Sequence, residues 1–350
     1  MNNYKISVII PFYNTPLILF DKCINSVINQ SFHEFEVIIV DDGSEKQYSE
    51  YLDKSYGKIP NLRIFHITNQ GVSKARNFAI SKSYGDNICF VDSDDYIAPW
   101  MLEDMYDAKI NHGADICISY IKKVSNSSFT FERNQEYELL DRNIKENLNF
   151  IDEIILRGIN IKENKYGFLS CGPCSILVDT NIVKQVEFPV DILYMEDVIW
   201  NYKIFSLANK IIKLNETLYA YVENIKSATR KFNQNIVNER IKALYKLHGI
   251  LSLNQDSIQW YNLRVLCNFS MIYYQYGHIE SCHVGDLINS IQLAYKTTYS
   301  KHWRQWLANS NNKNWELKYK FKYLLYKLKI LPLICIAKEF MNSVLLTDKE

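Results

Sequence analysis

At 350 residues the chain is long enough to bury one large hydrophobic core or two smaller ones. Hydrophobic residues make up 47% of it and charged residues 23%, a balance that excludes wholesale disorder. The formal net charge of +1 excludes a nucleic-acid binder that depends on overall positive charge, so we expect no nucleic-acid partner.

The sequence shows no pattern typical of export or of a membrane span. A strand-like segment begins almost at the first residue, where a signal peptide would have its charged and apolar regions. The longest apolar run, 330–337, contains a proline and is far shorter than the roughly 18 residues that span a bilayer. We therefore expect a cytoplasmic protein whose 8 cysteines are reduced.

Short apolar runs alternate with segments of helical periodicity in the first part of the chain. In chain order, the pattern predicts a strand at 6–10, a helix over 17–28, strands at 35–40 and 62–67, a helix from Val72 to near Gly85, a strand at 87–91, a helix over 99–112 that stops at Gly113, and a strand at 114–121. This alternation predicts an α/β fold with a mainly parallel, doubly wound sheet.

The later part of the chain is less regular and then becomes helical. We predict a strand near Phe129 and a helix over 144–156. From about residue 232 the strand pattern fades, and long segments rich in Tyr, Leu and Lys follow. The prediction is therefore an α/β domain over 1–230 and a helical C-terminal region over 231–350.

Polar segments follow four of the predicted strands at the points where these strands end. In a parallel doubly wound sheet, ligands bind at the carboxyl ends of the strands. We therefore expect the segments 11–14, 41–44, 69–71 and 92–95 to meet in one crevice. That crevice would hold five carboxylates and little positive charge apart from Arg76.

The acidic run Asp92-Ser93-Asp94-Asp95 has two interpretations. Closely spaced carboxylates repel one another unless a cation neutralises them, and hard oxygen ligands suit Mg²⁺ or Mn²⁺ holding a diphosphate. Alternatively, the run is a solvated turn in which Asp95 caps the next helix. An isolated run favours the turn, whereas a place at the end of a buried strand favours the cation.

Asp41, Asp42 and Arg76 also have both a functional and a purely structural interpretation. A carboxylate after the strand at 35–40 could accept the imide N–H of uracil or a ribose hydroxyl, or it could only form an Asx turn. Arg76 lies about one turn into a helix that starts near Gly71. There it could stack on a base or pair with phosphate, or it could be a solvent-exposed cation.

Glu196 and Asp197 precede an apolar helical pattern and therefore lie at a helix start. Consecutive residues point to different sides of a helix. One acid could cap the helix while the other faces the crevice as a general base, or both could only cap.

Taken together, these segments resemble glycosyltransferase family 2, whose fold is GT-A. The resemblance covers 4–120 strongly and 165–230 moderately. The segments that carry it are 8–14, similar to the family's first strand; 41–44, 71–77 and 92–95, similar to its nucleotide-sugar elements; and Glu196-Asp197 with Trp200, similar to its catalytic acidic pair.

The resemblance implies a binding site for a UDP-sugar donor. Pro11, Tyr13 and Asp42 would line the uracil and ribose site, Arg76 would approach the base and the diphosphate, and Asp92 would touch the ribose or the sugar. The complete set of residues implied for donor binding is Pro11, Tyr13, Asn14, Asp41, Asp42, Arg76, Asp92, Ser93 and Arg230.

The resemblance also implies a mechanism. Asp94 would ligate Mn²⁺ or Mg²⁺, which stabilises the departing diphosphate. Asp197, beside Glu196, would deprotonate the acceptor hydroxyl, and transfer would invert the configuration of the sugar. The acceptor would be a saccharide on a growing surface polysaccharide or on a lipid-linked oligosaccharide.

One segment departs from the family pattern. Many relatives have a Trp-Asn-Lys-Leu-like segment before the acidic pair, where this chain has Cys171-Gly172-Pro173-Cys174. The difference bears on the acceptor more than on the chemistry. The segment also resembles the thioredoxin motif, which would make the chain a thiol oxidoreductase using Cys171 and Cys174, but its position in mid-chain argues against this.

Two further functions are weighed against the transferase. The chain could be a catalytically idle nucleotide-sugar-binding subunit of a polysaccharide assembly complex, although acids at both the metal and the base positions argue against it. A nicotinamide dehydrogenase is disfavoured because no Gly-x-Gly-x-x-Gly follows a predicted strand.

Residues 313–329 contain six Lys and one Glu among aromatic and apolar residues. A basic, aromatic-rich helix suits an anionic membrane surface, and a lipid-linked acceptor would place such a contact, through 313–337, at the inner face of the cell membrane. The same pattern suits a helix that packs on its own domain with a lysine-rich outer face. Amphipathicity alone does not separate the two.

Overall fold

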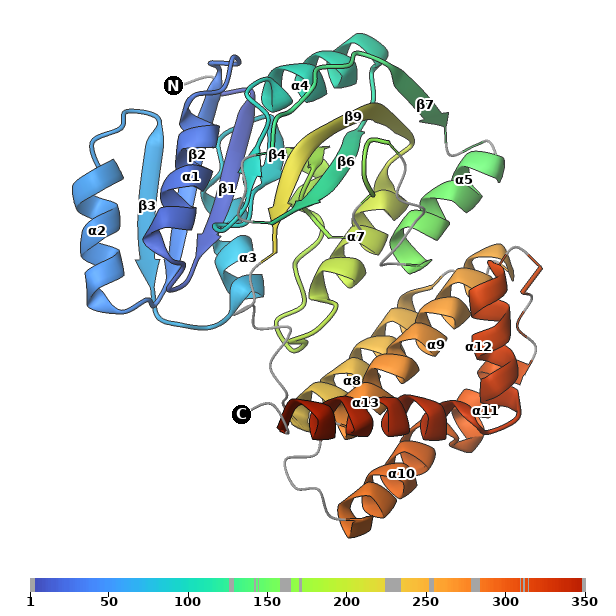
Figure 1. Ribbon diagram of the computed structural model, residues 1–350. Coiled ribbons are helices and arrows are strands. Elements are labelled where there is room, and N and C mark those ends of the chain that lie inside the picture. Colours follow the sequence, from blue (N-terminus) through green and yellow to red (C-terminus); the bar gives the residue numbers. More distant parts are fainter. Residues whose placement is uncertain are drawn as a thin grey trace. The chain divides into compact units, whose positions relative to one another are not determined.

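The computed structural model describes residues 4–125, 129–141, 143, 145–157, 165–169, 172–223, 234–251, 255–277, 284–308, 310, 312–313 and 315–347. The chain divides into two compact units, Met1–Ile225 and Lys226–Glu350. The first is α/β and the second is helical in its described part (Figure 1). The predicted fold class, including the helical C-terminal region, is confirmed, and the predicted boundary near residue 230 lies outside the described residues.

Four parallel strands form the first half of the sheet in the order β3-β2-β1-β4. They are β1 (Ile6–Phe12), β2 (Phe35–Asp42), β3 (Leu62–Ile67) and β4 (Asn87–Phe90), and the helices α1 (Leu17–Ile28), α2 (Lys46–Tyr56) and α3 (Val72–Lys82) connect them in turn. The predicted strands and helices of this half are confirmed, and α2 is an addition. Continuous runs of β-branched residues form β1 and β2 because both faces of these strands are buried.

The second half of the sheet is mixed. Its order from β4 onwards is β4-β8-β6-β9-β5, with β7 paired to β9; β8 is antiparallel to both neighbours, and β6 is parallel to β9. The strands are β5 (Tyr96–Ile97), β6 (Ile116–Val124), β7 (Tyr137–Asp141), β8 (Ile176–Asp179) and β9 (Lys210–Val222). Only β6 was expected here, because the other strands are short or carry charges that weaken the strand pattern.

The remaining helices of the first unit are α4 (Met101–His112), α5 (Lys145–Asp152), which continues into a π-helical turn at Glu153–Arg157, α6 (Thr180–Val183) and α7 (Glu196–Leu207). α4 begins two residues after the predicted start and ends at Gly113, whose φ of 56° gives the left-handed cap that glycine allows. The predicted strand near Phe129 is wrong. The Phe129 N–H donates instead to the Tyr96 hydroxyl (3.0 Å), and the next described strand is β7.

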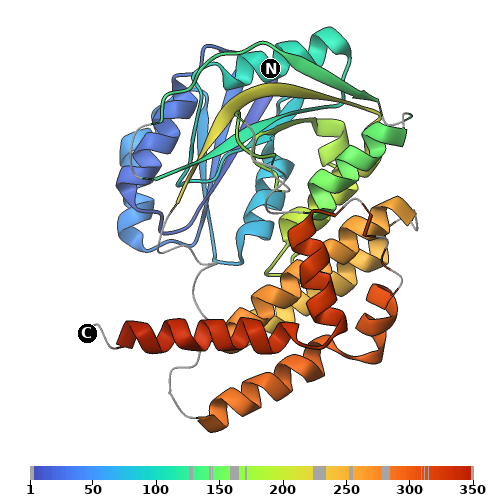
Figure 2. The ribbon, with the colours of Figure 1, turned by 45° about the vertical axis from the view of Figure 1, so that its right-hand side comes forward.

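Helices cover both faces of this sheet (Figures 1 and 2). On one face, Val8 and Ile10 pack with Phe20 and Ile24 of α1 in the main core. The other face carries α3 and α7, where Trp200 of α7 lies 5.5 Å from the Phe90 ring of β4. The side chains of β1, β2 and β4 are therefore buried on both faces of the sheet, and the carboxyl ends of these strands are the places open to a ligand.

The second unit is built around α9 (Gln255–Gly277). The other helices are α8 (Gln234–Ile250), α10 (Val284–Thr298), α11 (Lys301–Ala308), α12 (Leu317–Lys327) and α13 (Leu331–Thr347). The helices α8, α10, α12 and α13 all contact α9, and Trp303 of α11 lies 5.3 Å from the Phe269 ring of α9. None of the described helices is both long and apolar enough to cross a bilayer.

Candidate active site

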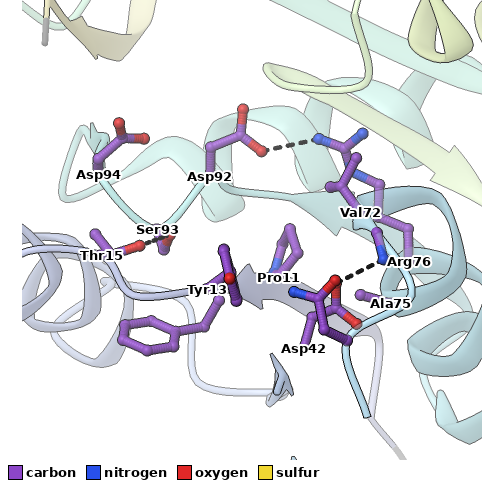
Figure 3. A pocket seen from close by; sticks show the side chains of 13 residues that line it. Pro11, Tyr13, Thr15, Asp42, Val72, Ala75, Arg76, Asp92, Ser93 and Asp94 are labelled. Atoms are coloured by element: carbon purple, nitrogen blue, oxygen red, sulfur yellow. Dashed lines mark hydrogen bonds and ion pairs between the residues drawn. The ribbon is translucent and has the colours of Figure 1, made fainter. Parts of the chain in front are cut away.

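A cavity of about 450 Å³ opens at the carboxyl ends of β1, β2 and β4, beside the start of α3 (Figure 3). All four segments predicted to meet at the strand ends contribute to it. Its lining residues are Pro11, Phe12, Tyr13, Thr15, Asp42, Asn69, Gly71, Val72, Ala75, Arg76, Asp92, Ser93 and Asp94. Of the predicted site residues, Asn14, Asp41, Glu196 and Asp197 lie outside this lining, and Arg230 lies outside the described residues.

Asp42 holds the loop that follows β3. Its two carboxylate oxygens accept the N–H groups of Gln70 (2.9 Å) and Gly71 (2.8 Å). Gly43 allows the close approach, because a Cβ there would lie 2.5 Å from the Asn69 nitrogen and the residue has a φ of 71°. Asp42 therefore lines the cavity and also fixes one wall of it.

Asp41 is buried next to this wall and is satisfied by donors. Its carboxylate accepts the Ser44 N–H (3.0 Å), the Ser49 hydroxyl (2.6 Å) and a hydrogen bond from Nδ1 of His66 (2.7 Å). Burial raises the pKa of Asp41, but the hydrogen bonds from Ser44, Ser49 and His66 outweigh it and lower the pKa below its usual value. Asn14, with a φ of 45°, joins the same loop by accepting the Glu45 N–H.

The acidic run after β4 is tied to β9. Asp95 accepts hydrogen bonds from the Tyr219 hydroxyl (2.7 Å) and the Val222 N–H (2.8 Å). The Tyr219 oxygen in turn accepts the Asp92 N–H (3.1 Å). The expectation that Asp95 caps the next helix is therefore wrong: its carboxylate anchors the run to a strand that is distant in sequence.

Asp94 differs from its neighbours because no other described residue donates a hydrogen bond to its carboxylate. Burial, together with the charge of Asp92, raises the pKa of Asp94 to about 6. Ser93, between the two, shares a hydrogen bond of 2.6 Å with the Thr15 hydroxyl (Figure 3). Within the described part of the chain, no positive charge compensates the Asp94 carboxylate at the edge of the cavity.

The side chains near the cavity limit how a metal ion could be bound. Among the described residues, no group of three or more His, Cys, Asp or Glu side chains is placed to hold a metal ion. Mg²⁺ is often bound by only one or two carboxylates, together with water and the phosphates of a substrate. The Asp94 carboxylate, which no described cation contacts, fits a cation of that kind.

Arg76 joins the acidic run to α7. Its guanidinium donates to Asp92 Oδ1 at 3.0 Å and to Glu196 Oε1 at 3.5 Å, and it lies 5.2 Å from the Phe188 ring centroid. Figure 3 shows the Asp92 carboxylate turned toward Arg76. Arg76 is only 5% exposed, which excludes the solvent-exposed cation considered above.

The adjacent acids at the start of α7 have different surroundings. Burial, followed by the charge of Asp197 and opposed by Arg76, raises the pKa of Glu196 to about 7. Asp197 Oδ1 accepts the N–H of the next residue, Val198, at 2.7 Å. Met195 precedes them in the left-handed region, with a φ of 64° and no side-chain cap. Glu196 is therefore the acid that is linked to the cavity, through Arg76.

Sequence reasoning missed Tyr219, which orders the acidic run from the middle of β9. Tyr219 is fully buried and lies 127 residues from Asp92. No motif marks it. The sequence signal available was the run of apolar and aromatic residues at 218–222, which is typical of a strand buried on both faces and does not single out Tyr219.

The structure does not support a redox role for the cysteine motif. Cys171 lies outside the described residues, and Cys174 is buried and free. Burial, together with the charge of Asp92, raises the pKa of Cys174 well above its usual value. Redox-active thiols have lowered pKa values, so Cys174 has the opposite property.

Comparisons with known proteins agree with this site. The sequence profile of glycosyl transferase family 2 matches residues 7–175. Glycosyltransferase GlyA of Streptococcus pneumoniae is 29% identical over 246 residues, which are 69% of this chain and only 34% of GlyA. An uncharacterized glycosyltransferase of Haemophilus influenzae is 30% identical over 248 residues, which are 63% of this chain and 97% of that protein.

Solved structures show the same fold. The crystal structure of S. aureus TarS 1-349 in complex with UDP-GlcNAc is similar with a TM-score of 0.65 and 20% identity, covering 97% of this chain and 92% of that one. The chain therefore belongs to glycosyltransferase family 2 and has its GT-A fold.

Proposed function

We propose that the chain is an inverting, metal-dependent glycosyltransferase that moves a sugar from a UDP-sugar to an acceptor hydroxyl. The observation that carries the proposal is one cavity that gathers Asp42 from the end of β2, Asp92 and Asp94 from the segment after β4, and Arg76 from α3. Such a crevice, at the carboxyl ends of parallel strands, is where a doubly wound sheet binds a nucleotide.

The donor is proposed to lie along the cavity from Tyr13 to Asp94. Tyr13 is 55% exposed, so its ring is free to stack on uracil, with Pro11 and Asp42 beside the base and ribose. Asp92, held by Arg76, is proposed to bind the ribose or the sugar. UDP is favoured because the similarly folded TarS 1-349 is described in complex with UDP and with UDP-GlcNAc.

Asp94 is proposed as the protein ligand of Mn²⁺ or Mg²⁺. A bound cation would supply positive charge to the diphosphate as it leaves. The protein's own contribution is to hold Asp94 in place, since its backbone follows directly from Asp92, which Tyr219 and Arg76 fix.

The proton of the acceptor hydroxyl is proposed to pass to the Asp197 carboxylate. The acceptor oxygen then bonds to the anomeric carbon while the bond to the UDP oxygen breaks and its electron pair leaves with UDP. Attack on the face opposite to UDP inverts the configuration. Glu196 would stay with Arg76 and keep the start of α7 next to the acidic run.

The acceptor is proposed to be a hydroxyl on a growing surface polysaccharide or a lipid-linked oligosaccharide. TarS of Staphylococcus aureus, which is named a poly(ribitol-phosphate) beta-N-acetylglucosaminyltransferase, is a relative at 28% identity. We place the reaction at the inner face of the cell membrane, with 231–350 as the region that meets the acceptor or the membrane.

Thermal unfolding with a panel of UDP-sugars, with and without Mn²⁺, is the first test. One UDP-sugar at about a hundredfold excess over its Kd should stabilise the protein by about 2.7 kcal/mol, and only with the cation. If no UDP compound stabilises the protein with Mn²⁺ or Mg²⁺, the donor proposal is wrong. Binding without any UDP release, with any acceptor, would instead identify an idle nucleotide-sugar-binding subunit.

Asp197→Asn tests the base. Transfer should fall by about a hundredfold or more, because a general base contributes about 10²–10⁴. UDP binding should stay close to that of the wild type. Glu187→Gln, which removes an exposed carboxylate of the segment before α7, serves as the control and should transfer normally. Near-wild-type turnover in Asp197→Asn contradicts the assignment.

A further inference from the structure

α12 exposes a stripe of large apolar side chains. Leu317 is 82% exposed, Phe321 59%, Leu324 49% and Leu328 57%. Their spacing of four, three and four residues places them on one face of the helix and of the turn that follows it. Soluble proteins seldom leave such a row of large apolar side chains uncovered without a partner.

The opposite face of α12 is the one that packs within the second unit. Tyr319, Tyr323 and Tyr326 are buried. The Tyr326 hydroxyl donates to the Thr298 carbonyl (2.9 Å), and its ring stacks on that of Tyr299 at 4.5 Å. The tyrosines therefore account for the packing of the helix on its own domain, and the exposed stripe needs another explanation.

Lysines lie on both flanks of the apolar stripe. At about 100° per residue, Lys318 and Lys322 fall on one side of it, and Lys320 and Lys327 on the other. None of these four lysines lies at the centre of the stripe. This arrangement of an apolar centre with lysines along both edges is that of a helix lying in a membrane interface.

The apolar surface continues past the end of α12. Ile330 is 38% exposed, and Leu333 and Ile334 at the start of α13 are 42% and 46% exposed. Lys329, also exposed, lies between them and α12. The stripe and these three residues are together called the α12 surface below.

We propose that the α12 surface docks on a lipid bilayer that contains anionic headgroups. The lysines on its flanks favour this occupant over a second copy of the chain, because pairing two such surfaces would bring lysines against lysines. The proposal rests on the membrane location given above for the reaction. Its test uses neither donor nor acceptor, so lipid binding and sugar transfer can each fail without the other.

Vesicle co-sedimentation of the full chain tests the proposal. The protein should bind vesicles of phosphatidylcholine with about 30% phosphatidylglycerol and should bind pure phosphatidylcholine about tenfold more weakly, since each lysine near an anionic surface adds to the attraction. Raising the salt from about 0.1 M to 0.5 M should weaken the binding, because added ions screen these charges.

Two double variants separate the apolar and the basic contributions. Leu317→Ser/Phe321→Ser and Lys318→Glu/Lys322→Glu should each weaken binding to the anionic vesicles by about tenfold. The matched controls are Ile288→Ser/Leu293→Ser on α10 and Lys296→Glu/Lys301→Glu, which change exposed residues elsewhere in the same unit and should bind as the wild type does. Circular dichroism and thermal unfolding verify that all four variants are folded.

Three outcomes overturn the proposal. The first is that the full chain does not bind anionic vesicles, and the second is binding that Leu317→Ser/Phe321→Ser and Lys318→Glu/Lys322→Glu leave unchanged. The third is a lipid-free dimer in sedimentation velocity that Leu317→Ser/Phe321→Ser abolishes, which would assign the surface to a second copy of the chain.

Discussion

Two pairs of carboxylates lie at the carboxyl ends of β2 and β4, the strands on either side of β1, and their surroundings differ. Asp41 and Asp42, the last two residues of β2, accept hydrogen bonds from backbone N–H groups, the Ser49 hydroxyl and His66. Of Asp92 and Asp94, after β4, Asp92 accepts a hydrogen bond from Arg76, which also donates to Glu196, whereas no described cation contacts Asp94. The first pair is satisfied by the fold itself.

The second pair differs in the electrostatic surroundings of Asp94. Hydrogen bonds lower the pKa of Asp41 despite its burial, whereas burial and the neighbouring Asp92 raise the pKa of Asp94 to about 6. Acidic residues at a strand end are therefore not a binding site by themselves. Hydrogen bonds satisfy Asp41, which supports a loop, whereas repulsion from Asp92 acts on Asp94, the proposed cation ligand.

Asp94→Asn should have the largest effect on function. Transfer should fall by about a hundredfold or more, because an electrostatic contact to the leaving group is lost. The variant should unfold at a higher temperature than the wild type without divalent cation, since its repulsion with Asp92 is gone. Initial rates over a Mn²⁺ titration, and thermal unfolding with EDTA, measure the two effects. A less stable variant would show that Asp94 is not strained by its neighbour.

Asp41→Asn should have the largest effect on stability. We expect the free energy of unfolding to fall by about 2 kcal/mol at pH 7, because a buried carboxylate with three donors is replaced by an amide that cannot accept from all of them. Since the pKa of Asp41 is lowered from 3.8, the advantage of the wild type should disappear as the pH falls below that value. Urea unfolding measures both.

Asp53→Asn is the matched control for Asp41→Asn. Asp53 contacts the other ring nitrogen of His66 at 3.1 Å, but its side chain is 64% exposed. Its removal should cost about 0.5 kcal/mol, as for other exposed ion pairs. If Asp41→Asn and Asp53→Asn lose the same free energy of unfolding, the hydrogen bonds accepted by Asp41 are not what stabilises the loop after β2.

Tyr219→Phe should have an intermediate effect, shared between folding and donor binding. It removes the hydroxyl that bridges Asp95 and the Asp92 N–H, at about 1 kcal/mol of stability. The KM for the donor should rise severalfold while kcat changes less, because the variant loosens the acidic run without touching the base. An unchanged KM would mean that the Asp92–Arg76 and Asp95–Val222 contacts hold the run without the Tyr219 hydroxyl.

Glu196→Gln should have the smallest effect, and one that depends on pH. The folded pKa of about 7 lies above 4.5, so the stability that protonated Glu196 contributes is complete below pH 4.5 and is lost as the pH rises through 7. The free energy of unfolding of Glu196→Gln should therefore rise relative to that of the wild type as the pH increases from 4.5 to 7. Urea unfolding of both proteins at pH 5 and pH 8 measures this change. An equal difference in stability between the two proteins at both pH values would contradict the prediction.

The first four strands and their helices could be predicted because each has its own local pattern. Buried β-branched runs and helical spacing are features of a few consecutive residues, and the polar segments at the strand ends follow from the parallel order. The strand predicted near Phe129 was wrong for the same reason that β7, β8 and β9 were missed. Their pairing depends on partners far along the chain. In addition, β9 carries charged residues in its middle, where the local pattern predicts a loop.

The sequence by itself determined the family, the α/β class, the helical C-terminal region and the segments that line the cavity, because these follow from short motifs and local periodicity. Only the tertiary structure decided that Asp95 anchors β9, that Arg76 joins Asp92 to Glu196, and that the apolar side of α12 stays exposed while its tyrosines pack. The partners of Asp95 and Arg76 lie 124 and 120 residues away, at Tyr219 and Glu196. Hydrogen bonds over such separations leave no local trace in the sequence, and an amphipathic helix does not reveal which of its faces meets the core.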